Sequence, residues 1–206
     1  MNRNLKAPKV FLDLMEFWTK HCHLEDYHLQ WAMESFEILN LKRGEYLFHE
    51  GSNLKITGLV MNGLLAREKE GSWKGRRRLV LIAGQYQSIS TTIHPYSTTC
   101  IMGDIVALRK SLILVIGNKK IRQGLEQDPN TACLVNILSN NNSRALAKML
   151  TVKESTSPSE RYLLFDRLFP ELRKLTTQRE QADLLGISRD TVQKMQRFLL
   201  FNGQNR

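Results

Sequence analysis

Glycines punctuate the middle of the chain so densely that long helices are not expected there. Seven of the twelve glycines lie between Gly44 and Gly84, and they separate short segments. Glycine is disfavoured inside helices and common in the turns between strands. Runs of β-branched, aliphatic and aromatic residues, which favour strands, occupy residues 46–48, 56–61, 64–67, 79–82, 105–108 and 112–116. This pattern predicts about eight short antiparallel strands in a sandwich or jelly roll.

The composition is that of an ordinary globular protein. The 206 residues are 42% hydrophobic and 24% charged, which fits one large domain or a larger and a smaller one. The longest apolar runs, such as residues 112–116, are too short to span a bilayer. Asp13 and Glu16 stand where a secretory signal would need its apolar core. A cytoplasmic protein is therefore expected.

The residues that commonly carry catalysis or bind metals form no clear motif. Cys22, Cys100 and Cys133 are widely spaced, which predicts reduced thiols and no disulfide. His21 and His23 flank Cys22, but successive side chains diverge on a helix, so no metal site is expected. The sequence has no Gly-x-Ser-x-Gly elbow and no His-Glu-x-x-His pair, and an enzyme is not expected.

The charge balance points to an anionic partner. Thirty lysines and arginines against twenty acidic residues give a net charge of +10, which attracts polyanions such as nucleic acid. One basic cluster, at residues 75–78, lies beside a predicted hairpin turn and includes Arg76, Arg77 and Arg78. It is interpreted as a solvated strand end, with contacts to DNA phosphate, an anionic effector or RNA polymerase as alternatives.

Helical spacing of apolar residues appears on both sides of the glycine-rich region. Residues 11–39 have it, which predicts short amphipathic helices. Residues 129–153 are predicted to form one long helix with a coiled-coil-like seam. That seam is the predicted homodimer interface, with packing on the chain's own sheet as the alternative; it consists of Leu134, Leu138, Asn141, Ala145, Met149 and Val152.

The C-terminal region carries the most specific pattern. After a polar break at residues 154–157, a helix begins with Ser157 as its cap and Pro158 at its first position. A second helix begins at Thr177 and ends at Gly186, and a third begins at Ser188 and runs toward Gly203. Helix, three-residue turn and helix together predict a helix-turn-helix, with a plain helical hairpin as the alternative.

Residue spacing within the pair supports the helix-turn-helix prediction. A small residue at Ala182 allows close approach, Gly186 permits a positive φ, and Val192 fills the wedge between the helices. The opposite face is polar and free to meet a major groove. Predicted DNA-binding residues on these helices and their caps are Thr177, Gln178, Ser188, Arg189, Asp190, Thr191, Gln193, Lys194 and Arg197.

Over nearly its whole length the sequence resembles the Crp/Fnr family of bacterial transcription regulators. Residues 42–51 and 58–65 resemble the first strands of the family's β-roll, and residues 175–198 are the most specific match. The resemblance implies an α+β fold: a double-stranded β-helix (jelly roll) effector domain at 1–128, a dimerisation helix at 129–153 and a winged helix-turn-helix at 154–206. It also implies that Arg189, Asp190 and Lys194 read bases of a palindromic site on double-stranded DNA.

The sequence departs from the family where cyclic-nucleotide-binding members hold the cyclic phosphate. Residues 84–101 contain neither the glutamate nor the arginine of that motif. Cyclic AMP is therefore not expected to bind, and no cofactor is assigned. Arg67 or residues 76–78 could supply a cation from a neighbouring strand. The hydroxyl-bearing candidates for an effector pocket are Ser88, Ser90, Tyr96, Ser97, Thr98 and Thr99.

Two further departures limit what the resemblance implies. Three scattered cysteines cannot supply the four ligands of the iron-sulfur cluster found in the oxygen-sensing branch. The chain also has little sequence after the recognition helix for a wing strand. The expected effector is therefore a neutral or apolar molecule, or there is none. The alternative function is a ligand-binding regulatory module that acts through protein contacts.

Overall fold

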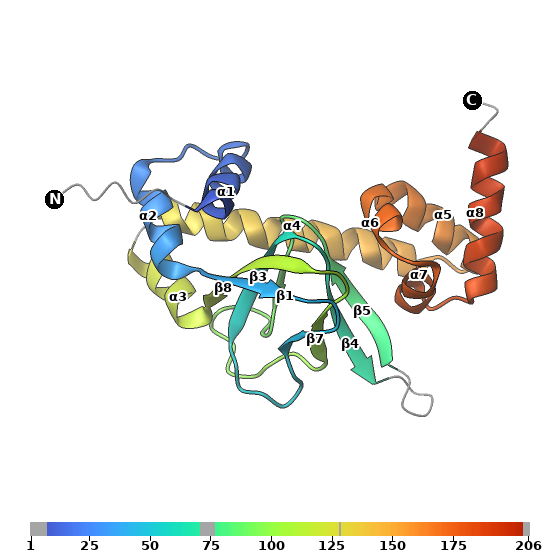
Figure 1. Ribbon diagram of the computed structural model, residues 1–206, viewed down its shortest axis with the longest axis horizontal. Coiled ribbons are helices and arrows are strands. Elements are labelled where there is room, and N and C mark those ends of the chain that lie inside the picture. The colour runs from blue at the N-terminus through green and yellow to red at the C-terminus, as the bar shows by residue number, and fades with distance from the viewer. Residues whose placement is uncertain (1–7, 71–76, 128, 204–206) are drawn as a thin grey trace. The chain divides into compact units, whose positions relative to one another are not determined.

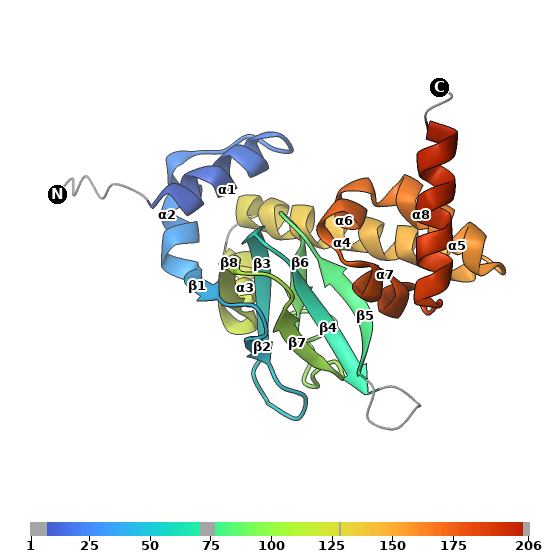
Figure 2. The same cartoon turned by 45° about the vertical axis from the view of Figure 1, so that its right-hand side comes forward.

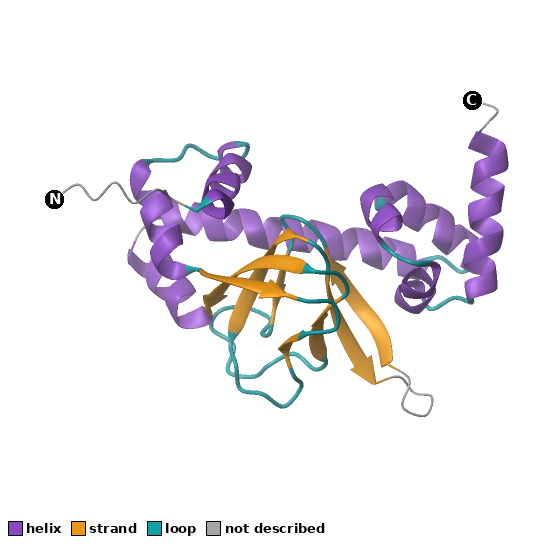
Figure 3. Ribbon diagram, viewed as in Figure 1, coloured by secondary structure: helices purple, strands orange, loops and turns teal. Residues whose placement is uncertain are grey.

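The computed structural model describes residues 8–70, 77–127 and 129–203 (Figure 1). Its described part has two four-stranded antiparallel sheets and eight helices (Figure 3). One sheet has the order β1-β8-β3-β6 and the other β2-β7-β4-β5, as Figure 2 shows from a second side. The strands are β1 (Glu37–Leu41), β2 (Tyr46–Phe48), β3 (Ile56–Asn62), β4 (Leu65–Glu70), β5 (Arg77–Ala83), β6 (Ser88–Ser90), β7 (Asp104–Ala107) and β8 (Ser111–Gly117).

The helices lie before and after the strands in sequence. Residues before the first strand form α1 (Lys9–Thr19) and α2 (Asp26–Ser35), and residues after the last form α3 (Asn118–Gln127) and α4 (Pro129–Glu154). Four more follow: α5 (Pro158–Leu168), α6 (Pro170–Leu175), α7 (Gln178–Leu185) and α8 (Arg189–Gly203). None of the described helices is long and apolar enough to cross a membrane. The predicted α+β roll with a C-terminal helix-turn-helix is confirmed.

The chain divides into two compact units. The first comprises residues 1–67 and 83–142, and the second residues 68–82 and 143–206. Each unit therefore combines separate stretches of sequence. The hairpin of β4 and β5 falls largely in the second unit, with the C-terminal helices, and α4 belongs to both units.

The first unit has its hydrophobic core between the sheet β1-β8-β3-β6 and a layer of helices. Trp18 of α1 is fully buried there, with Leu59 of β3 and Leu114 of β8. Alternate residues of a strand point to opposite faces, so Leu59 and Met61 face this helical layer. A Cβ atom added at Gly58 would lie 2.9 Å from Leu47 Cδ2. A side chain at position 58 would therefore meet Leu47.

The long helix α4 also contributes to this core. Leu134 and Leu138 are buried in the hydrophobic cluster of the first unit. Met149 and Val152 are also buried within the chain, and Asn141 and Ala145 are half-buried. Most residues of the predicted seam are thus buried within their own chain, and Leu134 and Leu138 pack on its sheet, which was the alternative to a homodimer interface. By contrast, Leu146 and Leu150 are 53% and 59% exposed.

The second unit ends in four helices whose boundaries follow local signals. Ser157 Oγ accepts a hydrogen bond from the Glu160 N–H at 3.1 Å and caps α5. Pro170 ends α5 and also occupies the first turn of α6, where its missing N–H costs no hydrogen bond. Residues 154–203 contain no strand, so the structure shows no wing in the described part of the predicted DNA-binding domain.

Candidate nucleic-acid interface

Reciprocal capping fixes where α7 begins. Thr177 Oγ1 accepts a hydrogen bond from the Glu180 N–H at 3.2 Å, and Glu180 Oε2 accepts one from the Thr177 N–H at 2.7 Å. Both interactions satisfy N–H groups that a helix N-terminus leaves without intrahelical partners. The predicted capping box is thus present, and it holds Thr177 exposed at the start of the helix.

A left-handed glycine separates α7 from α8. Gly186 has φ +65°, and its N–H donates to the Ala182 carbonyl. The Ile187 N–H donates to the same carbonyl at 3.1 Å. Ser188 Oγ then accepts the Thr191 N–H at 3.0 Å, which caps α8. The three-residue turn 186–188 thus ends one helix and starts the next, as predicted for a helix-turn-helix.

Apolar side chains pack this small helical domain. Tyr162 and Phe165 of α5 are fully buried, as is Val192 of α8, with Ala182 and Met195 nearly so. The Tyr162 and Phe165 rings lie 6.3 Å apart between centroids. Because Ala182 and Val192 are both buried, the wedge predicted from their spacing is present.

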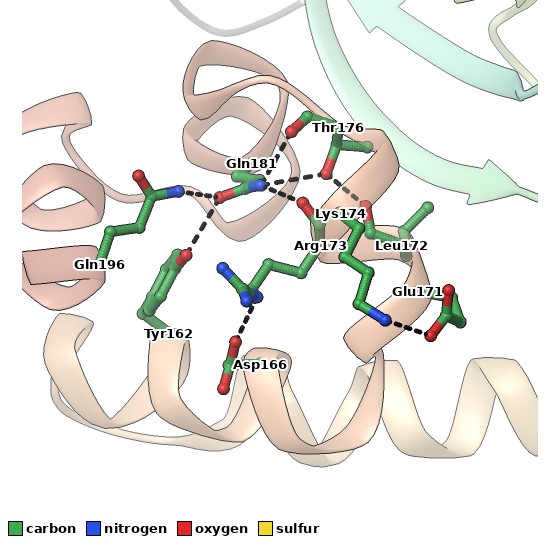
Figure 4. Close-up of polar contacts among 9 residues, drawn as sticks. All are labelled: Tyr162, Asp166, Glu171, Leu172, Arg173, Lys174, Thr176, Gln181 and Gln196. Atoms are coloured by element: carbon green, nitrogen blue, oxygen red, sulfur yellow. Dashed lines mark hydrogen bonds and ion pairs between the residues drawn. The ribbon is translucent and has the colours of Figure 1, made fainter. Parts of the chain in front are cut away.

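A buried glutamine links all four helices of the domain (Figure 4). Gln181 is 1% exposed, and its Nε2 donates to the carbonyls of Arg173 at 2.8 Å and Thr176 at 3.0 Å. Its Oε1 accepts hydrogen bonds from the Tyr162 hydroxyl at 3.3 Å and Gln196 Nε2 at 3.2 Å. Gln181 therefore fixes α8 against α5 and the end of α6.

An ion pair and two further glutamines extend this polar network. Arg173 Nε lies 2.5 Å from Asp166 Oδ1 and joins α6 to α5. Gln178 Nε2 donates to Gln196 Oε1 at 2.7 Å, and Gln193 Nε2 donates to Gln178 Oε1 at 3.2 Å. Gln178 and Gln193 were predicted as DNA contacts, and both are half-buried at the contact between α7 and α8.

The remaining predicted residues of α8 form a solvent-facing surface. Arg189, Asp190, Lys194 and Arg197 are exposed. Positions 190, 194 and 197 lie four and three residues apart, so they share one face of the helix. Ser188 is exposed beside Thr191, whose Oγ1 lies 2.9 Å from its hydroxyl. The exposed charges on this helix are mainly positive, as phosphate or base contacts require.

The predicted effector residues are spread over two environments. Ser88 is buried, and its N–H donates to Asn142 Oδ1 at 3.0 Å, while its hydroxyl accepts a hydrogen bond from Asn142 Nδ2. Half-buried Ser90 Oγ accepts from the Thr57 hydroxyl at 3.0 Å. Tyr96, Thr98 and Thr99 are exposed. Ser97, half-buried, uses its hydroxyl to accept the His94 N–H at 3.2 Å.

Arg67 reaches the loop that replaces the cyclic-phosphate motif. It is 4% exposed, and its Nη1 donates to the carbonyls of Ile101, Met102 and Gly103 at 3.1–3.4 Å. Its Nη2 donates to the Ser90 carbonyl at 2.5 Å. Burial lowers the pKa of Arg67. The guanidinium is thus occupied by backbone oxygens of this loop. Arg77 and Arg78 are described and exposed, whereas Arg76 lies outside the described residues.

A cavity of about 50 Å³ lies on the helical side of the first unit's sheet. Its walls include Trp18, Phe36 and Leu138, together with Thr57 and Ser88. Trp18 Nε1 is buried and finds no acceptor among the described residues. Of the six predicted effector residues, this cavity includes only Ser88 in its lining.

The described residues contain no group of three or more histidine, cysteine or acidic side chains that could hold a metal ion. His21 and His23 are exposed after the end of α1, and the Cys22 thiol donates to the Trp18 carbonyl at 3.7 Å. The structure therefore does not bring these three side chains together as a ligand set.

The structure resembles solved transcription regulators. FixK2 from Bradyrhizobium japonicum is 16% identical over 82% of this chain and 86% of that chain, with TM-score 0.66. CLP from Xanthomonas campestris, a c-di-GMP-responsive global regulator, is 11% identical, covers 87% and 93%, and has TM-score 0.64. A structure from Eubacterium rectale described as a Crp/Fnr-family transcriptional regulator is 14% identical, covers 91% and 87%, and has TM-score 0.62.

No protein-family model matches the sequence, and neither does any curated protein. At these low identities the similarity to solved structures concerns the fold. The fold is that of Crp/Fnr transcription regulators, as the sequence resemblance implied.

Proposed function

We propose that this protein is a sequence-specific DNA-binding transcription regulator of the Crp/Fnr type that acts as a homodimer. The observation that carries the proposal is the capped helix-turn-helix, whose α8 presents Arg189, Lys194 and Arg197 to solvent. The fold shared with known regulators supports it. In this proposal residues 1–128 sense an effector, 129–153 dimerise and 154–206 bind DNA.

The predicted DNA-binding residues have three different roles in this proposal. Arg189 and Lys194 reach base edges or the neighbouring phosphates, since a long cationic side chain can do either in a major groove. Thr177, Ser188 and Thr191 lie at helix N-termini, where hydroxyls and N–H groups suit phosphate oxygens. Gln178 and Gln193 hold α7 against α8 and so position this surface.

A binding-site selection from random duplexes, followed by gel-shift titration, tests the proposal. We expect a palindromic site and an affinity that falls steeply with salt, because phosphate contacts release counterions. Arg189→Ala should weaken the binding free energy for that site by about 1–3 kcal/mol and reduce the sequence preference at one base pair. Arg167→Ala, exposed on α5, is the matched control and should change neither.

Two results would count against DNA recognition by α8. Equal binding of selected and scrambled duplexes by wild type and Arg189→Ala would exclude this helix as the reader. Binding of no duplex at low salt would favour the alternative of a regulatory module that contacts protein.

We also propose that the effector is not cyclic AMP. The Arg67 guanidinium is already bound to four carbonyl oxygens, so a cyclic phosphate would have to displace them to gain an arginine partner. A charged group buried without such a partner is costly. Calorimetric titration with cyclic AMP and cyclic GMP should show no binding at micromolar concentrations, and binding in that range would overturn this part of the proposal.

A further inference from the structure

Three cationic side chains from separate elements meet behind the turn between α7 and α8. They are Arg78 of β5, Lys153 near the end of α4 and Arg161 of α5, which we call the turn cluster. All three belong to the second compact unit. The DNA-binding proposal gives them no role.

Backbone contacts bring the turn cluster together. A Cβ built on Gly186 would lie 2.8 Å from Arg78 Nη2, so this guanidinium rests on the turn. Arg161 Nη1 donates to the neighbouring Leu185 carbonyl at 3.2 Å, and its Nη2 to the Ser155 carbonyl at 2.8 Å. Lys153 Nζ donates to the Val80 carbonyl at 3.4 Å, two residues from Arg78 on the same strand.

The positive charge of the turn cluster is not neutralised locally. Within the described ranges 8–70, 77–127 and 129–203, no carboxylate forms an ion pair with any of its three members. Burial lowers the pKa of Lys153, and the charges of Arg78 and Arg161 lower it further. Arg161 Nε is buried and has no acceptor among the described residues. The site therefore has surplus charge and spare donors.

We propose that the turn cluster binds the phosphate group of a small molecule, and that the bound phosphate bridges β5, α4, α5 and the turn of the helix-turn-helix. A phosphate carries up to two negative charges and three acceptor oxygens, which suit a pair of guanidinium forks and an ammonium. The source is a small molecule and not the DNA backbone, because two of the three members, Lys153 and Arg161, are half-buried, whereas the α8 cations, like Arg78, are exposed.

Bound phosphate would affect the domain through the elements it joins. It removes the mutual repulsion of three cations and adds a shared partner for β5 and the 185–186 turn. Because it binds the folded arrangement, it should raise the thermal stability of the protein, and the increase should grow with the logarithm of the phosphate concentration above the dissociation constant.

Calorimetry and thermal unfolding of the full chain test this inference. Inorganic phosphate, pyrophosphate and a nucleoside monophosphate are titrated at constant ionic strength held with chloride. We expect binding and a raised melting temperature with at least one of them. Binding of inorganic phosphate but not of the nucleoside monophosphate would identify free phosphate as the ligand, whereas binding of the nucleoside monophosphate would identify a phosphate ester. Arg78→Gln and Lys153→Met should each weaken binding about tenfold or more.

Matched controls are available on the same elements. Arg77→Gln on β5 and Lys148→Gln on α4 remove exposed positive charges and should leave phosphate binding unchanged. No binding by the wild type, or equal weakening by the controls, would overturn the inference. So would an Arg78→Gln variant that loses DNA affinity and salt dependence while phosphate has no effect, because the cluster would then contact the DNA backbone. Circular dichroism verifies that each variant is folded.

Discussion

At the residue scale, Gln181 is the polar group on which the geometry of the helical domain depends most. Its amide is buried and bonded on both its nitrogen and its oxygen. Replacement by leucine keeps the volume but removes the hydrogen bonds that Gln181 makes to the Tyr162 hydroxyl and to the carbonyls of Arg173 and Thr176. We expect Gln181→Leu to lower the free energy of unfolding by about 2–4 kcal/mol, since each unsatisfied buried group costs about 1–3 kcal/mol.

Urea titration followed by circular dichroism measures this loss. Gln85→Leu, at an exposed loop position, is the matched control and should shift the midpoint little. Equal midpoints for Gln181→Leu and the wild type would mean that the glutamine network contributes nothing to the packing of α8. A weaker DNA affinity in Gln181→Leu at a temperature where it is folded would show that the network also positions the reading surface.

Tyr162 gives the same domain a dependence on alkaline pH. Burial raises the pKa of its phenol in the folded state, so the unfolded chain ionises first as pH rises. The stability from Tyr162 is therefore fully present below about pH 10, the ordinary tyrosine pKa, and is lost as pH rises through the higher folded pKa. Tyr162→Phe lacks this ionisation, and also the hydrogen bond to Gln181.

We expect the stability advantage of wild type over Tyr162→Phe, about 1 kcal/mol near neutrality, to shrink as the pH rises above about 10. Urea unfolding of both proteins at each pH measures it. Comparison at equal pH cancels the groups that the two proteins share, Lys153 among them. A difference that stays constant with pH would contradict a perturbed phenol.

At the element scale, the turn between α7 and α8 depends on a backbone conformation that few residues adopt. Gly186 has φ +65°, and a Cβ there would also meet the Arg78 guanidinium. Because an L-residue in this conformation is strained by about 1–2 kcal/mol, Gly186→Ala should destabilise the chain by about that amount. The Arg78 guanidinium is the end of a flexible side chain, so it can move away from an added Cβ and adds little to this cost.

Gly117→Ala provides a matched control. Position 117 has no positive φ, and a Cβ there meets nothing within 4 Å. That change should be neutral or slightly stabilising, because alanine lowers the entropy of the unfolded chain. Thermal unfolding of the two variants compares them. The conformational argument for the turn fails if both lose the same stability.

Elements with strong local signals were predictable from sequence, and elements defined by tertiary contacts were not. The helix-turn-helix was predicted to within a residue because Thr177, Gly186 and Ser188 each mark a boundary by their own chemistry. Strand β1 was missed because helical spacing continued to Phe36, which in the structure ends α2. Helix α3 was missed because it has only two large apolar residues, Ile121 and Leu125, and contains Gly124, which is disfavoured inside helices.

The candidate site was predictable only on its exposed side. The exposure of Arg189 and Lys194 could be predicted because polar residues on the outer face of a helix need no tertiary partner, and their contact with DNA stays a prediction. Gln181 was missed, because its role depends on carbonyls of α6 and on the Tyr162 hydroxyl. The turn cluster was missed for the same reason: Arg78 and Arg161 are far apart in sequence and meet only at the folded turn.

At the scale of the whole molecule, DNA binding by two symmetric copies requires a dimer face that the chain leaves open. Two recognition helices must reach half-sites about 34 Å apart, so one copy alone binds weakly. The predicted seam is not that open face, because Leu134 and Leu138 fill the core of the first unit. Leu146 and Leu150 are exposed one turn apart on α4, and we expect the partner helix to cover them.

Charging these two leucines tests the dimer. Leu146→Glu with Leu150→Glu should give monomers in sedimentation and abolish specific DNA binding while circular dichroism stays native, because two carboxylates cannot be buried in an apolar interface. Lys148→Glu makes the same change in net charge at an exposed position of the same helix and should stay dimeric. A dimeric double variant would place the interface elsewhere, and a wild type that is monomeric at micromolar concentration and on DNA would exclude the homodimer altogether. Only a monomer that also loses the palindromic site would tie the exposed face of α4 to recognition by α8.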